Sequence, residues 1–224
     1  MFKMINKVLI AEDHESANLS VQKTLEDLGV SDPDHVFYCD DALLKIQKGV
    51  QVGRPYDLLI TDLYFEVDHA RQNLSGGVAL IAAARKVQPD LRVLVFSAES
   101  KAAVIEALFE KYGIDGYVRK ARNDARDLKT AIELIDRNER YLPRHLAELV
   151  KRKNVFDFKE FDMAILSLMA EGVRQKNLPD KLRERNFEKS SLSTIEKRLK
   201  TIREVLEFTN NEQLIAYCKD MGIV

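Results

Sequence analysis

The sequence contains only two cysteines and no long run of apolar residues. Cys39 and Cys218 lie far apart and fit neither a metal-binding spacing nor a Cys-x-x-Cys spacing, so a reducing compartment is the simplest expectation. No apolar run approaches the roughly 20 residues that a membrane span needs. Residues 1–10 are too short and too charged for a signal peptide. We therefore expect a cytoplasmic protein that makes no membrane contact.

Net charge is also nearly absent, because 35 Lys and Arg residues stand against 36 Asp and Glu residues and leave a formal charge of −1. This balance argues against a chain-wide electrostatic attraction to nucleic acid, so such binding would need a local basic face. Apolar residues make up 46% and charged residues 32% of the chain, which is typical of a soluble globular protein. A length of 224 residues suits one large domain or two modest ones.

In residues 1–138, apolar strands alternate with amphipathic helices. The pattern predicts strands at residues 7–11, 36–39, 58–60, 92–96 and 116–118, and helices at residues 17–28, 42–47, 78–87, 102–112 and 127–138. Strands this apolar are buried on both faces, as in a parallel sheet covered by helices. Right-handed crossovers then favour a doubly wound, five-stranded α/β domain.

The character of the chain changes after this domain. Residues 139–155 are rich in Arg and Lys, and we interpret them as a linker. Residues 156–224 show only helical periodicity, which predicts a small all-α domain with a first helix at residues 161–171. A second helix is indicated by apolar residues that recur every three or four positions, at Leu192, Ile195, Leu199, Ile202 and Leu206. Thr209 and Glu212 fit a capping box for the last helix.

Polar residues follow four of the predicted parallel strands. Glu12 and Asp13 come after the first strand, Asp62 after the third, Ser97 after the fourth and Lys120 after the fifth. In a doubly wound sheet, ligands bind at this carboxyl edge. Three carboxylates that meet there repel one another, and their oxygen donors suit Mg²⁺ or Mn²⁺. A lysine and a hydroxyl beside such an ion can neutralise a transferred phosphoryl group, which a carboxylate can accept as an acyl phosphate.

These residues and their neighbours resemble the flavodoxin-like receiver domain of bacterial response regulators. The resemblance covers residues 6–137 and rests on Glu12-Asp13, Leu-Leu-Ile-Thr-Asp62, Val-Phe-Ser97-Ala and Gly-Tyr117-Val-Arg-Lys120. It implies a two-component system in which Asp62 accepts a phosphoryl group from a sensor histidine kinase. It also implies that phosphorylation promotes a homodimer.

The resemblance assigns a role to each matched position. The metal ligands would be Glu12, Asp13, Asp62 and the backbone carbonyl of Tyr64. Ser97 and Lys120 would hold the phosphoryl group. Ser97 and Tyr117 would change conformation with phosphorylation and so act as the switch.

Residues 63–75 depart from the receiver pattern, because receivers have a much shorter loop after the phosphoacceptor. The segment is polar and borders the predicted site. Either it covers that site or contacts the kinase, or it is a tolerated surface insertion. We expect His69 to be solvated, as a lone loop histidine usually is.

The last part of the chain resembles the LuxR-type helix-turn-helix domain over residues 161–224. The matching stretches are Ile-Leu-Ser-Leu-Met-Ala-Glu-Gly172, Ser193-Thr194-Ile-Glu-Lys197-Arg198-Leu-Lys200-Thr201-Ile and Asn-Asn-Glu-Gln-Leu-Ile-Ala-Tyr. The apolar stripe of the second helix must face the domain core, which leaves a basic, hydroxyl-bearing face for a DNA major groove. The expected DNA contacts are Ser193, Thr194, Lys197, Arg198, Lys200 and Thr201.

Two observations keep an alternative open for this domain. Acidic residues roughly match basic ones in number, and residues 183–191 make the connection to the second helix longer than is usual in the family. The alternative is a helical output domain that binds a protein partner instead of promoter DNA. An enzyme is not expected, because the domain contains no cluster of nucleophile, base or metal ligands.

Overall fold

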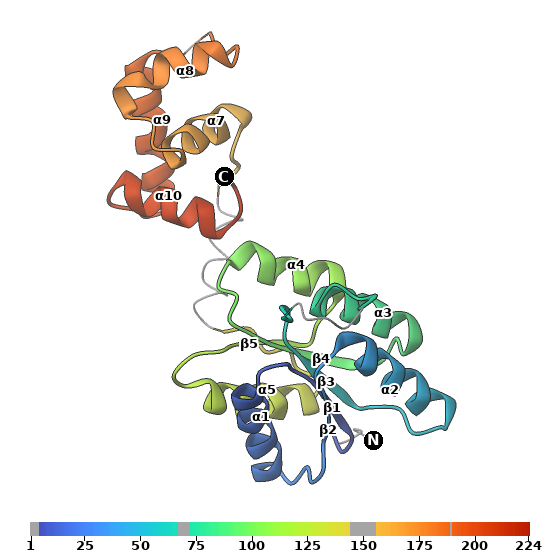
Figure 1. Ribbon diagram of the computed structural model, residues 1–224. Helices are drawn as coiled ribbons and strands as arrows, with labels where there is room; N and C mark the ends of the chain where they lie inside the picture. The colour runs from blue at the N-terminus through green and yellow to red at the C-terminus, as the bar shows by residue number, and fades with distance from the viewer. Residues whose placement is uncertain (1–4, 67–71, 144–155, 189) are drawn as a thin grey trace. The chain divides into compact units, whose positions relative to one another are not determined.

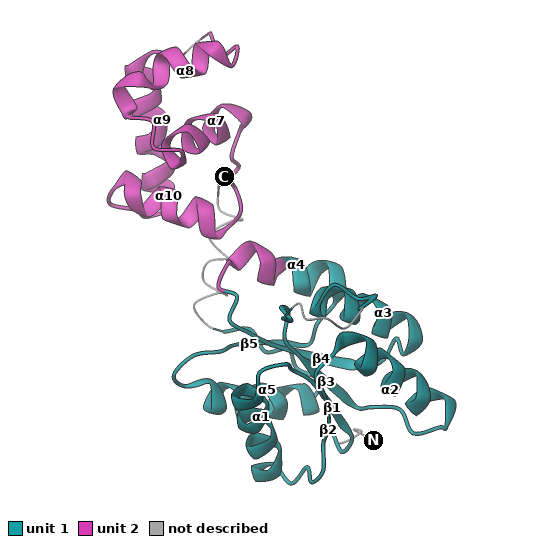
Figure 2. Cartoon of the chain, viewed as in Figure 1, with its two compact units in different colours: residues 1–99, 107–143 teal, residues 100–106, 144–224 magenta. Residues whose placement is uncertain are grey.

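The computed structural model describes residues 5–66, 72–143, 156–188 and 190–224. The chain divides into two compact units (Figure 2): Met1–Glu99 with Ala107–Pro143 form unit 1, and Ser100–Glu106 with Arg144–Val224 form unit 2. Most of the expected linker, from residue 144 to residue 155, lies outside the described residues. Among the residues described, no helix combines the length and the apolar character that crossing a membrane requires.

Unit 1 contains a parallel sheet of five strands (Figure 1). The strands are β1 (Val8–Ala11), β2 (Asp34–Val36), β3 (Leu58–Thr61), β4 (Arg92–Ser97) and β5 (Gly116–Arg119). Their order in the sheet is β2-β1-β3-β4-β5, so the chain reverses its direction of travel across the sheet after β2. The predicted doubly wound α/β fold is confirmed, and the reversal between β1 and β3 marks the edge where such sheets bind ligands.

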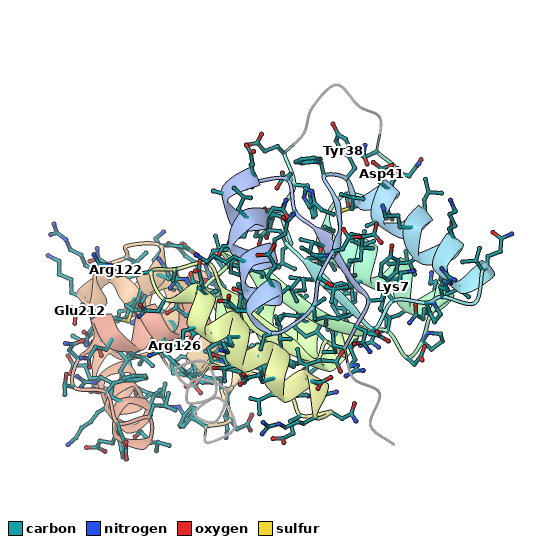
Figure 3. All side chains as sticks on the ribbon, turned by 90° about the horizontal axis from the view of Figure 1, so that it is seen from below. Lys7, Tyr38, Asp41, Arg122, Arg126 and Glu212 are labelled. Carbon is teal, nitrogen blue, oxygen red and sulfur yellow. The ribbon has the colours of Figure 1, made fainter. Side chains whose placement is uncertain are left out.

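Helices cover both faces of this sheet, with α1 and α5 on one side and α2, α3 and α4 on the other (Figure 1). Their bounds are α1 (Glu15–Asp27), α2 (Cys39–Gln51), α3 (Gly77–Val87), α4 (Ala102–Tyr112) and α5 (Asp124–Asp136). Alternate residues of each strand point to opposite faces. Val8, Ile10, Leu58, Ile60 and Leu94 therefore join one core cluster with residues of α1 and α5, and side chains crowd the space between the sheet and its helices (Figure 3).

The second strand and second helix differ from the prediction. The strand was expected at residues 36–39 but spans Asp34–Val36, and the helix was expected at residues 42–47 but spans Cys39–Gln51. Because β2 is an edge strand, its half-exposed residues need not be apolar, which hid it from the pattern. Gly49, which lies beyond the predicted end of the helix, belongs to the helix, where a Cβ atom would lie 3.0 Å from the carbonyl oxygen of Arg54. The labels of Tyr38 and Asp41 in Figure 3 mark the start of this helix.

Unit 2 consists of short helices around a small apolar core. Its elements are α7 (Glu160–Ala170), the 3₁₀ turn η1 (Gln175–Asn177), α8 (Leu178–Glu184), α9 (Leu192–Val205) and α10 (Asn211–Asp220). The predicted apolar stripe holds at Ile195, Leu199 and Ile202, which are buried, whereas Leu192 is partly exposed. The expected all-α domain is therefore confirmed.

The predicted cap of the last helix was placed one residue too early. Asn210, and not Thr209, is the N-cap residue, and its side chain accepts a hydrogen bond from the backbone N–H of Gln213. The Gln213 side chain in turn accepts bonds from the backbone N–H and the hydroxyl of Thr209. The predicted capping box is therefore wrong, because the Gln213 side chain bonds Thr209 whereas the Gln213 backbone N–H bonds Asn210, and Glu212 takes no part in the cap.

Gly77 allows α3 to begin directly against the carbonyl group of Asp62. A Cβ atom at this position would lie 1.8 Å from the Asp62 backbone oxygen. We predict that Gly77→Ala lowers the free energy of unfolding by about 3 kcal/mol or more, at the upper end of the cost of overpacking. Gly53→Ala is the control, because it has open space and a φ of 69°, and it should cost only about 1 kcal/mol. Urea unfolding followed by circular dichroism measures both, and equal losses would contradict the close approach.

Candidate phosphoryl-transfer site

Three carboxylates gather at the carboxyl edge of the sheet, as the sequence predicts. Glu12 and Asp13 follow β1 and Asp62 follows β3, and these strands are neighbours. One ligand atom from each of the three carboxylates, and one from His14, all lie within 4.8 Å of one another. Glu12 and Asp62 are only 2% and 5% exposed, so their negative charges must be compensated locally.

Lys120, which follows β5, supplies that compensation. Its Nζ lies 2.5 Å from Asp62 Oδ2 and 2.8 Å from Glu12 Oε2. Burial raises the pKa of Glu12, although the hydrogen bond and the charge of Lys120 act in the opposite direction. Burial alone would lower the pKa of Lys120, but its bonds to Asp62 and Glu12 raise that pKa above its usual value. The lysine therefore stays protonated beside the predicted phosphoacceptor.

Ser97 is the last residue of β4 and lies at the same carboxyl edge of the sheet. Its side chain is fully buried, and its hydroxyl has no hydrogen-bond partner among the residues that the structure describes. Its carbonyl oxygen accepts a bond of 2.9 Å from the backbone N–H of Lys120, so these two residues are held side by side. A buried hydroxyl without a partner is costly, and an oxygen of a phosphoryl group would satisfy it. The carboxylate oxygens thus fit a cation with oxygen ligands, and the Lys120 ammonium group and the Ser97 hydroxyl fit a phosphoryl group.

Tyr117 lies in β5 with its ring fully buried. Its hydroxyl donates to the carbonyl oxygens of Glu99, at 2.6 Å, and of Ser97, at 3.3 Å. The hydroxyl of Tyr64 donates to the Glu99 carboxylate at 2.6 Å, and this bond raises the pKa of Tyr64 to about 12. Glu99 therefore connects the residue predicted to switch with the loop after Asp62, a role that no sequence signal indicated. That the backbone carbonyl of Tyr64 binds a metal stays a prediction.

His14 was also missed by the sequence analysis. Its Nδ1 lies 2.9 Å from Asp13 Oδ1 and 3.4 Å from Glu12 Oε1. The hydrogen bond to Asp13 and the charge of that carboxylate raise the pKa of His14 above 6.5. The position of this residue directly after Glu12-Asp13 was the signal available in the sequence.

The inserted segment is attached to unit 1 at both of its described ends. The backbone N–H of Glu66 donates to Asp13 Oδ2 at 2.6 Å. The backbone N–H groups of Asn73 and Leu74 donate to the Asp40 carboxylate, and these bonds lower the pKa of Asp40. Residues 67–71, and with them His69, lie outside the described residues. One end of the insertion therefore contacts a predicted metal ligand directly.

The predicted DNA-binding face lies on α9. Ser193, Thr194, Lys197 and Lys200 are exposed, and Thr201 is half-buried. The expectation that Arg198 contacts DNA is corrected by the structure. Its guanidinium group forms a two-point ion pair with the fully buried Asp162, at 2.5 and 2.6 Å. An arginine that compensates a buried carboxylate is held inside its own domain, so we remove Arg198 from the expected DNA contacts. Its polar character in the sequence could not distinguish the two roles.

The fold is similar to that of proteins with solved structures. No family model matches the sequence, and the search of curated proteins finds no match. Among solved structures, the chain is similar to the RcsB response regulator of Salmonella typhimurium, with 22% identity over 98% of this chain and 99% of that chain and a TM-score of 0.60. A complex of RcsB with DNA gives 21% identity, coverage of 96% and 98%, and a TM-score of 0.62. The chain thus has the fold of a receiver domain followed by a small helical domain, as expected.

The bond between His14 and Asp13 gives a pH prediction. Since that bond and the negative charge of Asp13 raise the pKa of His14, Asp13→Asn should lower this pKa toward its ordinary value of 6.5. The protonated imidazole would then persist over a narrower pH range. NMR titration of the His14 ring protons in the metal-free protein measures the change. Glu15→Gln is a control at an exposed neighbour, and an unchanged His14 pKa in Asp13→Asn would contradict the geometry.

Proposed function

We propose that this chain is a phosphorylation-dependent response regulator that controls transcription. The observation that carries the proposal is the set of Glu12, Asp13, Asp62, Ser97 and Lys120 at one sheet edge, with Lys120 bonded to Asp62. This arrangement suits phosphoryl transfer, because each group can bind one charged oxygen of the transferred group or the cation beside it. The chain acts as a signalling protein rather than as an enzyme with a substrate of its own, and it works in the cytoplasm.

In the proposed reaction, a carboxylate oxygen of Asp62 attacks the phosphorus atom of a phosphohistidine on a sensor kinase. The bond between phosphorus and the histidine nitrogen breaks as the bond between phosphorus and oxygen forms, which leaves an acyl phosphate on Asp62. The Lys120 ammonium group moves from the carboxylate to a phosphoryl oxygen, and the Ser97 hydroxyl donates to another. Glu12, Asp13 and Asp62 would hold Mg²⁺ or Mn²⁺, which supplies further neutralisation of charge.

Phosphorylation then alters the surroundings of Tyr117 through Ser97. When the Ser97 hydroxyl turns to the phosphoryl group, the bonds that Tyr117 makes to the carbonyl oxygens of Ser97 and Glu99 can rearrange with it. This change would favour a homodimer, since proteins that read two-fold DNA sites are themselves two-fold.

For unit 2 we propose DNA binding by the exposed face of α9. Lys197 and Lys200 project from this face beside the hydroxyl groups of Ser193 and Thr194. A solved RcsB structure of the same fold is bound to a promoter in the presence of a phosphoryl mimic, with 23% identity and a TM-score of 0.57. That likeness supports promoter DNA over a protein partner. The protein-partner alternative is supported by the balanced charge of the domain and by two acidic residues on the same helix, Glu196 and Glu204.

The first prediction from this proposal concerns the phosphoacceptor. Asp62→Asn should abolish labelling by radioactive acetyl phosphate in the presence of Mg²⁺, because the amide cannot form the acyl phosphate. Asp41→Asn serves as the control, since this carboxylate lies in the first turn of α2 and should not affect labelling. Labelling of Asp62→Asn at the level of the unchanged protein would refute the assignment.

The second prediction concerns DNA. Replacing Lys197 and Lys200 together by Ala should change stability by less than about 0.5 kcal/mol per site, because both side chains are exposed. Binding to promoter fragments should weaken, and the slope of log K against log salt should fall by up to roughly 2 if each lysine contacts a phosphate. Lys181→Ala, an exposed site on α8 with an ion pair to Glu184, is the control. Gel shifts at several salt concentrations measure the affinity for promoter DNA and its salt dependence. Unaltered binding by the double variant would favour the protein-partner alternative.

A further inference from the structure

We infer that His14 contributes an imidazole nitrogen to the cation site and gives it a preference for a first-row transition ion such as Mn²⁺ over Mg²⁺. The inference rests on the proposed function in one respect, which is that both assign the cation to Glu12, Asp13 and Asp62. It adds a ligand of a different chemical kind to that site. It also gives the inserted segment after Asp62 a defined part in the chemistry.

The first support is the spacing of the donor atoms. At metal–ligand distances of about 2.1 Å, neighbouring donors in an octahedral site lie about 3.0 Å apart. His14 Nδ1 is 2.9 Å from Asp13 Oδ1 and 3.4 Å from Glu12 Oε1. The first distance matches adjacent corners of one coordination polyhedron, and the second is somewhat longer, so the His14 ring must turn toward Glu12 for both to act as ligands of one ion. Binding requires the proton between Nδ1 and Asp13 to leave for solvent, after which both atoms can face the cation.

The backbone fixes where this imidazole can reach. His14 is the N-cap residue of α1, and its backbone N–H donates to Glu12 Oε1 at 3.0 Å. The same turn therefore positions the carboxylate of Glu12 and the ring of His14. The side chain of His14 is 54% exposed, which leaves its ring free to make the small rotation that coordination needs.

The second support comes from the inserted segment. His14 Nε2 lies 3.9 Å from Glu66 Oε1, on the side of the ring opposite Nδ1. A histidine that binds a metal through one ring nitrogen almost always donates the other N–H to a carboxylate, carbonyl or water, which orients the ring. The backbone N–H of Glu66 also holds Asp13 Oδ2 at 2.6 Å. Glu66 thus lies beside two ligands of the inferred site: its backbone N–H is bonded to Asp13, and its carboxylate faces the Nε2 side of the His14 ring.

The choice of ion follows from ligand chemistry. Carboxylate and water ligands suit both Mg²⁺ and Mn²⁺, whereas an imidazole ligand is accepted more readily by transition ions than by Mg²⁺. Among divalent ions, Mn²⁺ tolerates a mixed set of oxygen and nitrogen donors and retains the charge that phosphoryl transfer needs. A site with Asp13, Glu12 and His14 together should therefore bind Mn²⁺ more tightly than Mg²⁺.

The test uses the full chain loaded with Mn²⁺ and measures electron spin echo modulation, which detects a nitrogen nucleus bound to the ion. The unchanged protein should show modulation from ¹⁴N, and His14→Asn should lose it. Asparagine is chosen because it is also a good N-cap residue. The Mn²⁺ dissociation constant should rise by about tenfold or more in this variant, with a much smaller change for Mg²⁺ measured by competition.

Two further variants sharpen the result. Glu66→Gln should retain the nitrogen signal but weaken Mn²⁺ binding, because the ring loses its orienting carboxylate. Glu15→Gln, at an exposed neighbour, should leave both quantities unchanged. Absence of a nitrogen signal in the unchanged protein, or an equal loss of Mn²⁺ and Mg²⁺ affinity in His14→Asn, would overturn the inference.

The outcome is separable from that of the proposed function. If acetyl phosphate with Mg²⁺ labels Asp62 but Mn²⁺ shows no nitrogen ligand, the inference fails and the proposed function stands. If the nitrogen signal is present but Asp62 is never labelled, the cation site is supported and the phosphoacceptor assignment fails.

Discussion

The pairing of Lys120 with two buried carboxylates is the interaction on which the carboxyl edge of the sheet in unit 1 depends. A parallel sheet brings Glu12, Asp62 and Lys120 to one edge from three separate strands, and removing the lysine would leave two buried carboxylates without their nearest positive charge. The cost of desolvating these groups is offset by the hydrophobic core beneath them. Because the single positive charge of Lys120 offsets only part of the carboxylate charge, any ligand that moves the lysine must bring its own compensation, and a phosphoryl group with a divalent cation does so.

Much of this arrangement could be predicted from the sequence, since the end of each apolar run marks the end of a strand in a doubly wound sheet. The fold and the positions of Asp62 and Lys120 follow from apolar runs and the residues after them. The second strand could not be placed, because an edge strand needs no continuous apolar pattern. The second helix was predicted to end before Gly49, because the close packing of this glycine against Arg54 and Tyr56 leaves no local signal.

The residues that the sequence did not reveal share one property, which is that their role depends on a partner distant in the chain. Arg198 looks like a DNA contact until Asp162 is placed beside it. Glu99 gains its position between Tyr64 and Tyr117 only when the sheet is assembled. His14 follows Glu12 and Asp13 directly, but it becomes a candidate ligand only when the sheet brings Asp62 into the same cluster. Pairings of this kind arise from tertiary structure and cannot be deduced from spacing.

The central claim is that this edge of the sheet binds a divalent cation and a phosphoryl group together. Fluorine NMR of the full chain with beryllofluoride, a mimic of the phosphoryl group, tests it directly. The account predicts bound fluoride resonances that appear only when Mg²⁺ or Mn²⁺ is added and that are absent from Asp62→Asn. Spectra that contain only free fluoride species in the presence of the cation, or bound signals that survive in Asp62→Asn, would contradict it.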